Sequence, residues 1–103
     1  MISKSLLIKT KDDMNNDYKI IKELGSGSFG TVYRVQNVLT GEVRACKRVN
    51  KRKMGKEESR FKTEIELLKK TDHPNIVKLF EVYEDKVYTY LVLEELQLKI
   101  SKI

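Results

Sequence analysis

Three glycines, at positions 25, 27 and 30, lie close together between two segments of strand-forming residues. Residues 18–24 precede them and residues 31–38 follow, and both segments are rich in β-branched or aromatic side chains. Because glycine has no Cβ, a turn of this composition lets backbone amides approach phosphate oxygens closely. The dinucleotide-binding form of the pattern requires a helix after the glycines, whereas a strand follows here. The run therefore predicts a β-hairpin that either covers phosphates or is a turn without a ligand.

The rest of the chain contains one helical pattern among further strand patterns. Residues 56–70 carry Phe61, Ile65 and Leu68 at helical spacing, with acidic residues in the first turn and lysines in the last. Pro74 ends that pattern because proline has no backbone N–H donor. The segments expected as strands are 18–24, 31–38, 42–49, 76–83 and 87–93. Three strands, a helix and two strands predict an α+β fold with a five-stranded antiparallel sheet and one main helix.

Length and composition describe one small domain. The 103 residues contain 21 Lys and Arg against 15 Asp and Glu, a formal net charge of +6. The densest basic run, 47–53, is followed at once by Glu57 and Glu58 and has no interleaved aromatic side chains, so we interpret it as a solvated surface rather than a nucleic-acid or lipid site. One cysteine, Cys46, and one histidine, His73, predict neither an internal disulfide nor a structural zinc site. No apolar segment is long enough to span a membrane, and a cytoplasmic protein is expected.

Two charged residues extend the phosphate-binding interpretation. Lys47 lies in the expected third strand, from which its ammonium group could reach phosphates covered by the hairpin. With helical residues about 100° apart, Glu64 borders the apolar stripe of the expected helix, so it is the candidate partner of Lys47. The alternatives are a solvent-facing lysine and a carboxylate that pairs locally with Lys62.

These motifs together resemble the N-terminal lobe of the eukaryotic protein kinases over residues 18–96. The sequence GSGSFGTV at 25–32 resembles the glycine-rich loop, ACK at 45–47 resembles the lysine motif of the third strand, and Glu64 resembles the helix-C glutamate. The sequence YLVLEEL at 90–96 resembles the fifth strand leading into the hinge between the lobes.

Other stretches favour one group within the kinases. Those most similar to calcium/calmodulin-dependent and calcium-dependent serine/threonine kinases are LTGE at 39–42, LKKTDHPNI at 68–76 and FEVYED at 80–85. We therefore expect a flexible leader over 1–16, a kinase N-lobe over 17–96, and a tail over 97–103 that is not similar to kinases.

The resemblance implies a nucleotide site and a role for each residue in it. Lys47 and Glu64 would form the catalytic ion pair, and Leu93 would be the gatekeeper. The Glu94 carbonyl and the Leu96 amide would hydrogen-bond the base of ATP, which a complete kinase binds with magnesium. The implied ATP-binding residues are Leu24, Gly25, Ser26, Gly27, Ser28, Phe29, Gly30, Val32, Ala45, Lys47, Leu93, Glu94 and Leu96.

The sequence lacks the motifs of the second kinase lobe. Neither the catalytic loop H-R-D-x-x-x-x-N nor D-F-G occurs, so the base and the metal ligands are absent and no metal site is expected. In the complete relative, ATP would phosphorylate Ser or Thr of a protein substrate; this chain alone is expected to be inactive. Apolar surface left uncovered by the missing lobe would favour self-association or a protein partner. A noncatalytic lobe that only binds a protein partner is the alternative function.

Overall fold

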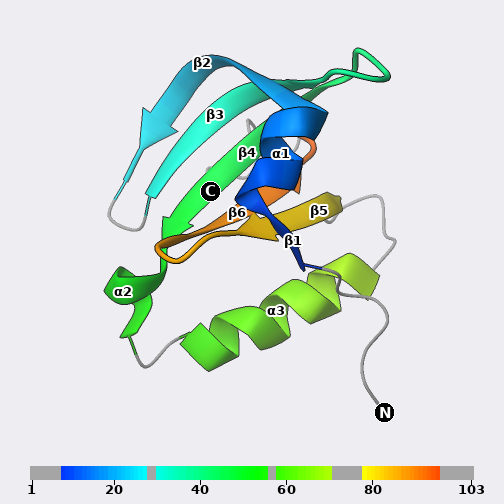
Figure 1. Cartoon of the computed structure of the whole chain (residues 1–103). Coiled ribbons are helices and arrows are strands. Elements are labelled where there is room, and N and C mark those ends of the chain that lie inside the picture. The colour runs from blue at the N-terminus through cyan, green and yellow to red at the C-terminus, as the bar shows by residue number, and fades with distance from the viewer. Residues whose placement is uncertain (1–7, 28–29, 56–57, 71–77, 96–103) are drawn as a thin grey trace.

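The computed structural model describes residues 8–27, 30–55, 58–70 and 78–95. Its elements are β1 (Ile8–Thr10), α1 (Lys11–Asp17), β2 (Tyr18–Ser26), β3 (Gly30–Asn37), β4 (Val43–Asn50), α2 (Lys51–Met54), α3 (Glu58–Lys70), β5 (Leu79–Glu84) and β6 (Tyr88–Leu93). The six strands form one sheet in the order β1-β5-β6-β4-β3-β2, with α1 and α3 on its two faces (Figure 1).

The expected α+β fold is confirmed, but the strand count is wrong. Strands β2 to β6 correspond to the five expected strands, and each pairs antiparallel with its neighbours among them. The sixth strand, β1, pairs with the edge strand β5 and runs parallel to it, with Ile8 opposite Val82 and Thr10 opposite Glu84. The sheet is therefore mixed. A strand of three residues is too short to show alternation, so its pairing depends on the open edge of β5 rather than on a local pattern.

The interpretation of residues 1–16 as a flexible leader is wrong for residues 8–16. Thr10 caps α1: its hydroxyl accepts a hydrogen bond from the Asp13 N–H at 3.1 Å, and the Asp13 carboxylate accepts one from the Thr10 N–H at 3.3 Å. This reciprocal capping box satisfies backbone donors at the helix start. Met14, the buried residue of α1, is only 4% exposed and packs into the core. One apolar residue in a polar stretch gives no periodicity, although the capping box was visible in the sequence.

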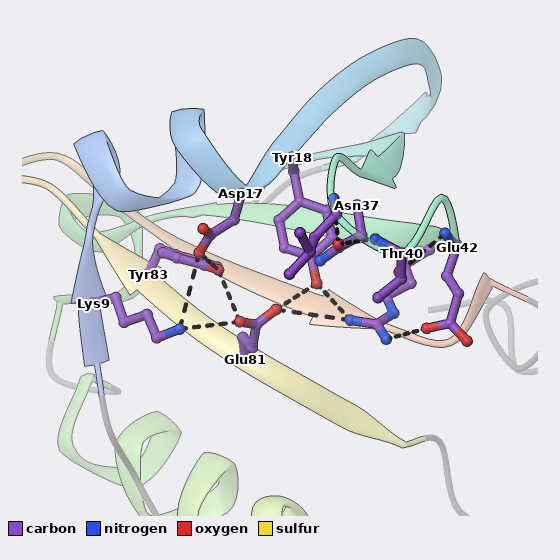
Figure 2. A network of polar contacts seen from close by, with 10 residues as sticks. Lys9, Asp17, Tyr18, Asn37, Thr40, Glu42, Glu81 and Tyr83 are labelled. Carbon is purple, nitrogen blue, oxygen red and sulfur yellow. Dashed lines mark hydrogen bonds and ion pairs between the residues drawn. The ribbon is translucent and has the colours of Figure 1, made fainter.

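A polar network also attaches this N-terminal segment to the sheet (Figure 2). The Lys9 ammonium group donates to Glu81 at 3.2 Å, and the Tyr83 hydroxyl shares its one proton between the carboxylates of Asp17, at 2.8 Å, and Glu81, at 3.0 Å. The Tyr18 hydroxyl donates to the other oxygen of Glu81. Burial alone would raise the pKa of Glu81, but the hydrogen bonds from Tyr18, Lys9 and Tyr83 and the charge of Lys9 hold it below its ordinary value.

The sheet separates two apolar clusters. On the face covered by α1, the buried residues are Met14, Tyr18, Val35, Cys46, Tyr83, Tyr90 and Val92. On the face covered by α3, they are Ile65, Leu79, Val82, Leu91 and Leu93, with Ile8 and Phe61 packed against them. Side chains alternate along a strand, so neighbours in sequence face opposite clusters. This alternation decides which residues can contribute to a site on the α3 side.

The remaining elements differ little from expectation. The expected helix is confirmed over Glu58–Lys70, while 56–57 lie outside the described residues, as do 76–77 of the expected fourth strand. The short helix α2 was not predicted; the Asn50 side chain caps it by accepting from the backbone N–H groups of the next turn. In the part of the chain that the structure describes, no helix is long and apolar enough to cross a membrane.

Candidate functional site

The glycine-rich turn joins β2 to β3, and one of its glycines is required by the sheet. Gly25 lies opposite Val32 across the hairpin, and the Gly27 N–H donates to the Gly30 carbonyl at 2.8 Å. A Cβ on Gly30 would lie 1.7 Å from the backbone oxygen of Arg48 on β4. Since no side chain tolerates such a distance, Gly30 is glycine because β3 and β4 approach closely there.

The packing of the described residues does not require the other two glycines. A Cβ added to Gly25 or Gly27 would meet no heavy atom within 4 Å, and neither residue has a positive φ. The space next to both positions is therefore open to a ligand. This is the arrangement a phosphate-covering turn needs, since a bound phosphate must approach the backbone closely. Ser26 lies in β2 opposite Thr31, and Ser28 and Phe29 lie outside the described residues.

The predicted base-binding residues of the inner strands gather on the α3 face. Val32 lies opposite Lys47 and Lys47 opposite Leu91, while Ala45 lies opposite Leu93. Because cross-strand partners point to the same face, Val32, Ala45 and Lys47 share the face that carries Leu91 and Leu93. Ala45 is fully buried and Leu93 is 2% exposed.

Leu24 lies further out on β2, where 36% of its surface is exposed. The structure thus brings the predicted pocket residues of β3, β4 and β6 together and places Leu24 at their margin. Leu96 lies outside the described residues.

Lys47 is half-buried on this face. Burial lowers the pKa of its ammonium group, and no charge or hydrogen bond from another described group counters that effect. A partly desolvated ammonium group with no partner among the described side chains is suited to bind an anion. Helix α3, which contains Glu64, packs on the same face through Ile65. The side chain of Glu64 lies outside the described part of the chain, so its pairing with Lys47 stays a prediction.

The residues after β6 are held by contacts from both sides. The Glu94 N–H donates to the Lys78 carbonyl at 3.1 Å, and the Glu94 carboxylate accepts from the Lys78 N–H at 3.2 Å. Glu95 accepts two hydrogen bonds from the Arg34 guanidinium group, at 2.7 and 2.8 Å. Sequence reasoning identified Glu94 but missed Arg34 and Glu95. The available signal was the position of Arg34 two residues after Val32, which puts both side chains on one face of β3.

The described residues contain no group of three or more His, Cys, Asp or Glu side chains that could hold a metal ion. An open depression of about 420 Å³ lies elsewhere, between β1, the start of α2 and the β5–β6 turn, and none of the predicted nucleotide-site residues lines it. The candidate site is therefore the α3 face of the sheet beside the glycine-rich turn.

Comparison with known proteins identifies the family to which the chain belongs. Residues 18–100 match the protein kinase domain. The chain belongs to the protein kinase family. This confirms the resemblance noted in the sequence, and the β2–β6 sheet with α3 is the N-lobe of that family.

The kinase relatives include calcium-dependent enzymes. Calcium-dependent protein kinase 5 of Plasmodium berghei (strain Anka) is 43% identical over 94 residues, which are 90% of this chain and 16% of that protein. Calcium-dependent protein kinase 3 of Plasmodium yoelii yoelii is 35% identical over 92 residues, 88% of this chain and 17% of that protein. A probable myosin light chain kinase of Dictyostelium discoideum is 42% identical over 78 residues, 76% of this chain and 24% of that protein. The chain thus spans between 16% and 24% of the length of these relatives.

Proposed function

We propose that this chain is the ATP-binding lobe of a serine/threonine protein kinase. The observation that carries the proposal is the arrangement of Lys47: it lies half-buried and without a described partner on the α3 face, on the strand next to the glycine-rich turn. The open space at Gly25 and Gly27 supports it further, because the packing of the residues that the structure describes does not account for glycine there.

In this proposal the lobe binds the two ends of ATP by different means. The backbone N–H groups around Gly25 and Gly27 and the Lys47 ammonium group hold the phosphates, and Glu64 of α3 orients Lys47. Val32, Ala45 and Leu93 contact the adenine ring, whose hydrogen-bonding edge meets the Glu94 carbonyl and the Leu96 amide. In a complete kinase, magnesium bound to ATP neutralises charge on the phosphates.

ATP titration of the 103-residue chain tests the proposal. We expect a dissociation constant of roughly tens of micromolar to millimolar, about −4 to −6 kcal/mol, because these 103 residues supply only one side of the nucleotide enclosure. Lys47→Met should weaken ATP binding about tenfold or more, since it removes a charge-assisted contact to phosphate. NMR titration suits this affinity range.

Lys53→Met is the matched control. Lys53 is an exposed lysine of α2, so its loss should leave ATP binding unchanged. Absence of any response at millimolar ATP would contradict the proposal, and so would equal losses in the two lysine variants.

A noncatalytic interaction module is the second candidate function. It is favoured by exposed apolar side chains in the β3–β4 turn and at the start of β4: Leu39 is 92% exposed, Val38 51% and Val43 47%. Contact through this turn with a second copy or another protein would cover them. A module of this kind predicts complex formation without ATP binding, so the same titration separates the two functions.

A cytoplasmic location forms part of the proposal. Cys46 is a free, fully buried thiol, which suits a reducing compartment. Phosphoryl transfer to a protein Ser or Thr belongs to the complete kinase in this proposal, because the catalytic-loop and D-F-G motifs do not occur in these 103 residues.

A further inference from the structure

Residues 94 and 95 are fixed between two parts of the sheet that are far apart in the chain. On one side, Glu94 exchanges two hydrogen bonds with the backbone of Lys78, which directly precedes β5. On the other side, Arg34 of β3 binds Glu95 through both Nε and Nη2. A segment attached only through its covalent link to β6 could rotate. Contacts from Lys78 on one side and Arg34 on the other restrict its position.

The position of Arg34 in the sheet links this contact to the candidate site. Arg34 lies opposite Ala45, and Ala45 lies opposite Leu93, so all three side chains belong to the α3 face. The Arg34–Glu95 pair is therefore at the outer border of the surface proposed to bind adenine. In the sheet, β3 and β6 are the two neighbours of β4 (Figure 1), so the pair between Arg34 of β3 and Glu95 after β6 spans β4.

The geometry of the pair makes it rigid. The Arg34 side chain is 26% exposed and the Glu95 side chain 14% exposed, so water screens the contact only partly. Two parallel N–H···O bonds between a planar guanidinium group and a planar carboxylate fix orientation as well as distance. The other ion pairs between described residues lie elsewhere. Lys9 pairs with Asp17 and Glu81, Arg44 pairs with Glu42 and Glu81, and Lys51 pairs with Glu84. None of these reaches the residues after β6.

We propose that Arg34 is a positioning residue for base recognition. By holding Glu95 it fixes the neighbouring Glu94 carbonyl, which accepts the hydrogen bond from the 6-amino group of adenine. This role rests on the proposed ATP-binding function. Guanine carries an oxygen acceptor in place of that amino group, so a fixed carbonyl both favours adenine and disfavours guanine. Hydrogen bonds weaken steeply with distance and angle, so a mobile carbonyl would discriminate less.

The phosphate contacts do not depend on this pair. Gly25 lies on β2, Gly27 in the turn after β2 and Lys47 on β4, and the two hydrogen bonds between Arg34 and Glu95 involve none of them. Loss of the Arg34–Glu95 pair should therefore reduce the preference for ATP over GTP, whereas loss of Lys47 should weaken both nucleotides alike. This difference separates base positioning from nucleotide binding in general.

The experiment measures dissociation constants for ATP and GTP by NMR titration of the full 103-residue chain. Arg34→Gln should raise the dissociation constant for ATP about fivefold and change that for GTP by no more than about twofold. The dissociation constant for GTP divided by that for ATP, called here the GTP/ATP ratio, should therefore fall. The double variant Arg34→Glu with Glu95→Arg should restore the ratio, since it rebuilds the ion pair with reversed charges.

Arg44→Gln is the matched control on the opposite face of the sheet. Arg44 binds Glu42 at 2.6 Å and lies 3.8 Å from Glu81, so its loss should lower the melting temperature without changing the GTP/ATP ratio.

An unchanged ratio in Arg34→Gln, in a chain that binds ATP through Lys47, would overturn the positioning role and leave the proposed function standing. A ratio that falls equally in Arg44→Gln would overturn it as well, because general loosening would then be the cause. If the unchanged chain binds no ATP, the proposed function fails and the positioning role fails with it.

Discussion

At the residue scale, the three positions of the glycine-rich motif are occupied by glycine for different physical reasons. Gly30 is required by a close approach of two backbones inside the sheet. Gly25 and Gly27 lie beside open space and neither has a positive φ, so the packing of the described part of the chain does not require glycine at either position. A single sequence pattern therefore combines a structural requirement with two positions that suit a ligand.

Alanine substitutions separate these roles. Gly30→Ala should lower the free energy of unfolding by about 2–4 kcal/mol, because its Cβ must displace the Arg48 carbonyl on β4. Gly27→Ala should leave stability unchanged or raise it by up to about 1 kcal/mol, since alanine restricts the unfolded chain, while weakening ATP binding. Urea unfolding measures the first quantity and nucleotide titration the second. Equal destabilisation by the two variants would show that both glycines serve packing.

At the scale of elements, β1 and α1 extend the five expected strands with an N-terminal unit. The unit adds a parallel strand to the edge of β5 and covers the face opposite α3 with Met14. Ile8 also packs against the apolar cluster on the α3 side, so the unit contacts both clusters. Glu81 of β5 joins this unit to the sheet, since it accepts hydrogen bonds from Lys9, Tyr18 and Tyr83 (Figure 2).

The pKa of Glu81 makes this attachment dependent on pH. Its pKa lies below the ordinary value of 4.5 in the folded chain, so folding favours the charged form. The contribution of Glu81 to stability is therefore complete above about pH 4.5 and is lost as the pH falls through the folded pKa. Glu81→Gln should lower the free energy of unfolding by about 1–3 kcal/mol at pH 7 and reduce the fall in stability on acidification.

Urea unfolding between pH 7 and pH 3 measures this effect, with Glu23→Gln as the control, because Glu23 is an exposed carboxylate of β2. If Glu81→Gln and Glu23→Gln had the same pH profile, the network would not contribute as inferred.

At the scale of the whole molecule, the sheet divides the chain into two faces with different roles. One face holds the polar network and α1, and the other holds α3 and the candidate nucleotide site. Phosphoryl transfer needs a base and metal ligands as well as bound ATP. The motifs that supply them in the family do not occur in these 103 residues, so binding and transfer should be separable here.

Phosphate incorporation tests this separation. With radiolabelled ATP and a peptide that contains Ser and Thr, we expect incorporation at the level of the protein-free control, because the catalytic-loop motif that supplies the base in the family does not occur in these 103 residues. The Lys47→Met variant should be indistinguishable from the unchanged chain. Turnover that persists through purification and disappears in Lys47→Met would contradict the expectation.

The amino-acid sequence alone determined the order of five strands and one helix, the glycine hairpin, the candidate role of Lys47 and the kinase family. Those features are local, because alternation, helical spacing and turn residues lie within a few positions of one another. The parallel strand β1, the different roles of the glycines and the Arg34–Glu95 pair were decided by the tertiary structure. Arg34 and Glu95 are 61 positions apart, and Ile8 and Val82 meet only when the edge of β5 is formed. Such contacts depend on which segments the folded sheet brings together, and no short stretch of sequence records that placement.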